Sequence, residues 1–86
     1  MKIKKELIKR DIAGDTILVP VGKSVYDSNG LFVLNELGSF LWDRLHQAQD
    51  RNELLEAVLE EYDVTRDQAA ADLDEFLGKL ANFGII

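Results

Sequence analysis

Residues 28–42, SNGLFVLNELGSFLW, change their hydrophobic period halfway along. Asn29 and Gly30 form a strong hairpin-turn signal, because both residues tolerate positive φ. The apolar run LFVL, residues 31–34, then predicts a short strand, and Asn35 is a suitable N-cap for a helix. The stretch therefore predicts a returning strand that leads directly into a helix.

Two further strands are predicted before this stretch, over about residues 7–13 and 16–21. Ile8 and Ile12 share one face of the first strand, because side chains alternate along a strand. Pro20 cannot donate a ladder hydrogen bond, which favours an edge position or a strand end for this residue. The first part of the chain thus predicts a small antiparallel sheet.

The rest of the chain predicts helices joined by short turns. Asp50 with Glu53 and Thr65 with Gln68 have the spacing of capping boxes, and Gly84 is a natural left-handed helix stop. Apolar residues recur at helical spacing between these signals. The predicted helices cover about residues 36–48, 51–62 and 66–83.

This element order predicts an α+β fold, with a three-stranded antiparallel sheet followed by three helices in one domain over residues 1–86. Leu41, Trp42 and Leu45 are expected in the core by their helical positions. A sheet with helix, short turn and helix is also the plan of winged helix-turn-helix domains, many of which bind DNA. The predicted fold is therefore winged helix-turn-helix-like.

Composition argues against several functions. The 86 residues carry a formal net charge of −6, which disfavours binding to a phosphate backbone and hence nucleic acid. The chain has no cysteine, which excludes disulfides and thiolate metal sites and fits a cytoplasmic location. No signal peptide or membrane span is recognisable, so no membrane association is expected. The lone His46 is expected at the surface, and the serines lack a nucleophile motif, so neither an enzyme nor a cofactor is predicted.

The run LFVL carries neither charge nor proline, although natural proteins usually protect sheet edges with such residues. In one interpretation both of its faces are buried, one against the helices and the other against a partner chain or the N-terminal segment. In the other, a peptide adds to this strand, with main-chain hydrogen bonds for affinity and side-chain pockets for specificity.

Three segments resemble the family of the pyrroloquinoline quinone biosynthesis protein D: GLFVLNELGSFLWDRL (30–45), EEYDV (60–64) and DLDEFLGKLANFGII (72–86). The resemblance implies a non-catalytic, cofactor-free element that recognises ribosomally made, post-translationally modified peptides. It implies that the leader segment of the precursor docks as an added strand on the third strand, beside the third helix. The leader is then presented to a modifying enzyme, often a radical S-adenosylmethionine enzyme.

The resemblance also implies which residues bind the peptide. Lys79 and Arg66 could pair with leader carboxylates and Asp72 with a leader basic residue, while part of the helical set must be core. The strand residues are Leu31, Phe32, Val33 and Leu34, and the helical wall comprises Ala69, Asp72, Leu73, Phe76, Leu77, Lys79 and Leu80.

The stretch KSVYDSNG (23–30) departs from a strict member of the pyrroloquinoline quinone pathway, so an element that serves another peptide product is expected. Domains of this type are also fused to larger enzymes, whereas this sequence begins and ends with the domain, so we expect a separate partner enzyme unless the chain is an excised fragment. Two other functions stay open: a winged-helix DNA-binding regulator, which the acidic helices oppose, and a structural homodimer that buries LFVL against itself.

Overall fold

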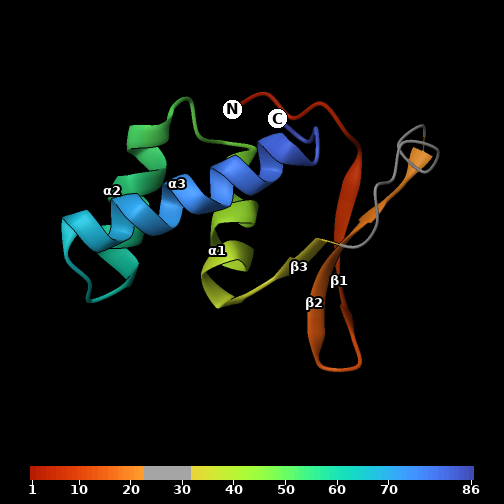
Figure 1. Cartoon of the computed structure of the whole chain (residues 1–86), viewed down its shortest axis with the longest axis horizontal. Coiled ribbons are helices and arrows are strands. Elements are labelled where there is room, and N and C mark those ends of the chain that lie inside the picture. Colours follow the sequence, from red (N-terminus) through yellow and green to blue (C-terminus); the bar gives the residue numbers. More distant parts are fainter. Residues whose placement is uncertain (23–31) are drawn as a thin grey trace.

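The structure is a computed structural model that describes residues 1–22 and 32–86. A sheet of three strands precedes three helices, which confirms the predicted α+β fold (Figure 1). The elements are β1 (Leu7–Ile12), β2 (Asp15–Pro20), β3 (Phe32–Leu34), α1 (Glu36–Leu45), α2 (Arg51–Glu61) and α3 (Arg66–Asn82). The predicted turn at residues 29–30 and the first residue of the predicted strand 31–34 lie outside the described residues.

The sheet is antiparallel with the order β1-β2-β3, so β2 is central and β3 lies at an edge. The β1–β2 hairpin turns at Ala13 and Gly14, both with positive φ (53° and 87°), as tight two-residue hairpins require. Pro20 ends β2 opposite Leu7, beyond the stretch that pairs with β3. Of the two positions expected for Pro20, the structure has the strand end.

The two faces of the sheet differ in burial. One face packs on the helices through Leu18, Phe32 and Leu34. Ile8 and Ile12 share a face as predicted, but this is the outer face, where both are exposed. Val33 also lies on the outer face and is 59% exposed, so in the described part of this strand, residues 32–34, the outer face is not buried.

The predicted helix starts have the expected cap bonds. Asn35 Oδ1 accepts from the Gly38 amide at 2.7 Å, and Asp50 Oδ1 accepts from the Glu53 amide at 3.0 Å. Thr65 Oγ1 caps α3 in the same way and accepts from the Gln68 amide at 3.2 Å. Each N-cap side chain therefore satisfies a backbone donor that has no partner within its helix.

The reciprocal half of each predicted capping box is absent. The Glu53 carboxylate accepts from the amide of Gln49, one residue before the cap, and the Gln68 side chain donates to Asp72 instead. The first helix ends at Leu45 rather than at about residue 48, and the Gln47 and Ala48 amides then both donate to the Arg44 carbonyl, at 3.1 and 3.0 Å.

The end of α3 brings the termini together. Gly84 has φ of 72°, its amide donates to the Ala81 carbonyl, and the Ile85 amide donates to the Leu80 carbonyl at 2.9 Å. This Schellman pattern buries Ile85 in the core. The Lys4 amide then donates to the Ile85 carbonyl, so the N-terminal segment lies beside the C-terminus (Figure 1).

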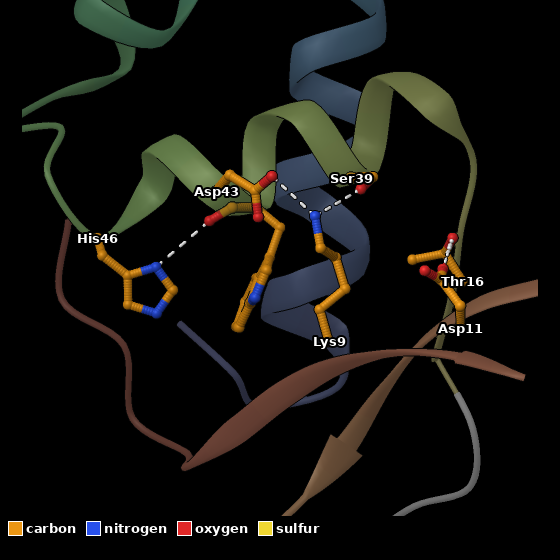
Figure 2. A network of polar contacts seen from close by, with 7 residues as sticks. Lys9, Asp11, Thr16, Ser39, Asp43 and His46 are labelled. Carbon is orange, nitrogen blue, oxygen red and sulfur yellow. Dashed lines mark hydrogen bonds and ion pairs between the residues drawn. The ribbon is translucent and has the colours of Figure 1, made fainter.

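The sheet is also joined to α1 by a polar contact (Figure 2). Lys9 of β1 donates to Asp43 Oδ2 at 2.7 Å and to Ser39 Oγ at 2.8 Å, both on α1. This contact flanks the buried residues of the helix, Leu41, Trp42 and Leu45, which are core as predicted. No helix in the described part of the chain is long and apolar enough to cross a membrane.

Candidate functional site

A groove with a volume of about 590 Å³ runs between β3 and α3, and the start of α1 lies against it. Residues from four elements line what we call the β3–α3 groove. They are Asp15, Phe32, Val33, Leu34, Asn35, Leu37, Gly38, Asp72, Glu75, Phe76 and Lys79.

The two edges of the sheet are built differently. The edge strand β1 carries Lys9, Arg10 and Asp11, which are the kind of charged residues that prevent a further strand from pairing. The edge strand β3 has the sequence FVL, without charge or proline. In the described part of the chain no strand pairs with the outer side of β3. The groove therefore lies beside the less protected of the two edges.

Gly38 sets how closely three elements meet at the groove. A Cβ atom added at Gly38 would lie 3.2 Å from Asn35 Oδ1 and 3.4 Å from both Leu34 Cδ2 and Phe76 Cε1. The glycine thus lets the first turn of α1 approach β3 and α3. Gly78 differs, because a Cβ there would meet nothing within 4 Å.

The structure divides the predicted helical wall into two stripes. Asp72, Phe76 and Lys79 line the groove. Ala69, Leu73 and Leu80 are core residues at 0–1% exposure and are not available to a ligand. Phe76 is also a core residue, at 8% exposure, but a part of it lines the groove. Leu77 is partly buried against the core and does not line the groove.

The predicted strand residues Phe32, Val33 and Leu34 line the groove, and Leu31 lies outside the described residues. The Arg66 guanidinium lies 3.2 Å from Glu56 Oε1 of α2 and is not part of the groove.

The sequence interpretation missed the groove residues that neighbour the two predicted segments: Asp15, Asn35, Leu37, Gly38 and Glu75. Glu75 could have been found, because it lies one turn from both Asp72 and Lys79. Asp15 could not, because its place depends on the pairing of β2 with β3.

Charge in the groove is mainly negative. Lys79 Nζ lies 3.2 Å from Glu75 Oε1, so the cation of the groove is balanced on its own helix. Asp72 Oδ1 accepts from Gln68 Nε2 at 2.8 Å. Glu75 is thus paired with a lysine, whereas neither Asp72 nor Asp15 forms an ion pair with any residue of 1–22 or 32–86.

Among the described residues, the shortest ion pair of α3 lies outside the groove. Arg51 Nε and Nη2 donate to the two carboxylate oxygens of Asp74 at 2.6 and 3.0 Å. These hydrogen bonds, with a smaller Coulomb contribution from the same guanidinium, hold the pKa of Asp74 below its usual range. The pair joins the start of α2 to α3 and leaves the groove side of α3 free of it.

The described residues form no group of three or more side chains that could hold a metal ion. His46 is exposed, with Nδ1 3.3 Å from the Trp42 carbonyl oxygen (Figure 2). The groove thus combines apolar side chains with carboxylates, next to a strand edge that no described strand covers.

Comparison with known proteins agrees with this geometry. One similar solved structure is TbiB1 in complex with the TbiA(beta) leader peptide, with a TM-score of 0.74 and 28% identity over 99% of this chain and 93% of that chain. Another is lasso peptide synthetase B1 complexed with the leader peptide, with a TM-score of 0.72 over 98% of this chain and 93% of that chain. At 19% identity, this second structure shows a likeness of fold alone.

A search of curated proteins gave no match. The family model for coenzyme PQQ synthesis protein D (PqqD) matches residues 16–86. This match confirms the resemblance seen in the sequence, and the chain belongs to the PqqD family.

Proposed function

We propose that this chain binds the leader segment of a ribosomally synthesised, post-translationally modified precursor peptide. The leader adds as a strand to the free edge of β3, and alternate side chains enter the β3–α3 groove. The observation that carries the proposal is the position of the groove beside an edge strand without charge or proline.

The backbone of β3 and the β3–α3 groove contribute differently to binding in this mechanism. The backbone of β3 supplies hydrogen bonds that any extended peptide can use, while the groove selects side chains. Phe32 and Phe76, with ring centroids 6.4 Å apart at 86°, are mostly buried, at 7% and 8% exposure, and the parts of them that line the groove supply apolar surface for a leader side chain. The membership in the PqqD family and the likeness to a leader-peptide complex at 28% identity support this assignment.

The chain itself acts as a binding partner and does no chemistry. It presents the bound leader to a modifying enzyme, for which the radical S-adenosylmethionine class is our proposal on the basis of the family resemblance. A cytoplasmic location agrees with the absence of cysteine. The net charge of −6 favours a peptide over DNA as the ligand.

Strand addition is tested by N-methylation of the ligand, which leaves the protein unchanged. The probe is the synthetic leader of the nearest encoded precursor peptide, with single backbone N-methyl groups placed at successive positions. An added strand turns alternate amides toward its neighbour, so N-methylation is expected to abolish binding at every second residue. Equal tolerance at all positions in fluorescence anisotropy would contradict strand addition.

The variant Val33→Pro tests the contribution of the β3 backbone to the hydrogen bonds with the added strand. Proline removes a strand donor in β3, and the Val33 side chain is exposed, so loss of binding with retained helical circular dichroism is expected. Unchanged affinity would remove β3 from the binding mechanism. The alternative is that two copies of this chain pair through the edge of β3 as a homodimer. A molecular mass that rises with protein concentration in analytical ultracentrifugation would favour this alternative.

A further inference from the structure

We infer that the peptide recognised by this groove carries Lys or Arg about two residues N-terminal to an apolar anchor residue. The inference rests on the proposed function and adds the charge and order of the side chains that the groove selects. It follows from the relative direction of β3 and α3, the distribution of charge along the groove, and the repeat lengths of helix and strand.

The side-chain contacts fix the relative direction of the two walls. The ring of Phe32 lies 4.9 Å from that of Phe83 at the C-terminal end of α3. Leu34, at the other end of β3, and Phe76 each lie 3.4 Å from the Cβ position of Gly38, and Phe76, two turns before Phe83, also faces the Phe32 ring at 6.4 Å. The walls therefore run in opposite directions, as the courses of β3 and α3 also show (Figure 1).

Charge is unevenly distributed along these walls. Asp72 lies one turn N-terminal to Phe76 and hence toward the Leu34 end of the groove. Asp15 lies at the same end, because it precedes Thr16, the pairing partner of Leu34. A leader side chain at this end therefore meets carboxylates that no cation of the described chain neutralises.

The opposite end of the groove differs in charge. Lys79 lies one turn C-terminal to Glu75, toward the Phe32 end, and the two side chains form an ion pair at 3.2 Å. Their charges cancel within α3, so this end offers a nearly neutral wall. The groove as a whole thus favours a cation at the Leu34 end.

Strand geometry relates this charge distribution to the order of residues in the bound leader. The existing sheet is antiparallel, and an added strand antiparallel to β3 has its N-terminal residues at the Leu34 end. One helical turn from Asp72 to Phe76 is about 6 Å, which a strand covers in about two residues. Residues two apart face the same side of a strand. The leader residue whose basic side chain contacts Asp72 therefore precedes by two positions the leader residue whose apolar side chain contacts Phe76.

The test selects binders from a random peptide library displayed on phage against the immobilised full chain. Enriched peptides are expected to share Lys or Arg, any residue, then an apolar residue. A synthetic selected peptide and its Lys→Gln form are then titrated with the parent protein, Asp72→Asn and Glu60→Gln. Glu60→Gln is the matched control, because it removes the same charge from α2, outside the groove.

Asp72→Asn is expected to weaken binding of the Lys peptide by about two- to fivefold at low salt, with no loss for the Gln peptide. Glu60→Gln should leave both affinities unchanged, and added salt should weaken the Lys peptide selectively. Thermal melts establish that both variants are folded.

Two other results separate the inference from the proposed function. Enriched peptides that bind through alternate amides but lack the basic residue, or equal effects of Asp72→Asn and Glu60→Gln, would overturn the charge inference alone. Failure to enrich any peptide, or binding that tolerates N-methylation at every position, would overturn both.

Discussion

The two glycines within helices provide a matched pair of variants that separates binding from stability. Gly78→Ala places a methyl group where nothing lies within 4 Å, on the exposed side of α3. Alanine is favoured over glycine in a helix interior by about 0.5–1 kcal/mol, because glycine loses more backbone freedom on folding. The variant should melt roughly 2–8 °C higher and bind the leader with unchanged affinity.

Gly38→Ala places the same methyl group at the groove. Its Cβ would lie 3.2 Å from Asn35 Oδ1, the atom that caps α1, and 3.4 Å from side-chain atoms of Leu34 and Phe76. The gain in stability from replacing glycine by alanine in the helix is therefore opposed by strain on the N-cap hydrogen bond, which contributes about 1 kcal/mol. The net change in the free energy of unfolding should lie near zero. The methyl group also takes space from a ligand side chain, for which we expect a roughly tenfold loss of affinity, equivalent to about 1.4 kcal/mol.

Both variants are measured in the same two assays, thermal melting by circular dichroism and fluorescence anisotropy with a labelled leader peptide. The expected pattern is crossed: Gly78→Ala gains stability and keeps binding, while Gly38→Ala keeps stability and loses binding. Equal affinity of the two variants for the leader would refute the assignment of the groove next to Gly38 as the binding surface.

Three further predictions concern the framework of the site. Leu73→Ala, at a residue with 0% exposure, should cost about 2–5 kcal/mol in urea unfolding. Asn35→Ala removes the acceptor for the Gly38 amide and should cost about 1 kcal/mol in the same assay. Arg51→Ala should return the pKa of Asp74 toward its ordinary value in an NMR titration. Because the pKa of Asp74 is lower in the folded state, the Arg51–Asp74 pair stabilises the folded protein at pH values above the unfolded-state pKa of about 4. This contribution disappears as the pH falls through the folded-state pKa.

Local sequence signals explain why the elements could be predicted. The Asn35 cap and the Gly84 stop each depend on neighbours within a few residues, and both act as expected. The apolar run ending at Leu34 likewise has its strand character from its own composition. These features need no knowledge of the tertiary structure.

The composition of the groove was only partly predictable, because it depends on how α3 is rotated against the sheet. Leu73 and Phe76 belong to the same apolar stripe in sequence and both are core residues, yet only Phe76 also lines the groove. Asp15 reaches the site through the pairing of strands, and Gly38 through the close approach of three elements. Such positions follow from packing and are not encoded by periodicity.

The central claim is tested most directly by titrating isotope-labelled protein with the leader peptide of the neighbouring precursor gene and following the backbone amides by NMR. The proposed mechanism predicts shifts concentrated at Phe32–Leu34 and on the groove side of α3 around Asp72, Phe76 and Lys79. Shifts confined to other surfaces, such as α2, or no shifts at high peptide concentration, would contradict it.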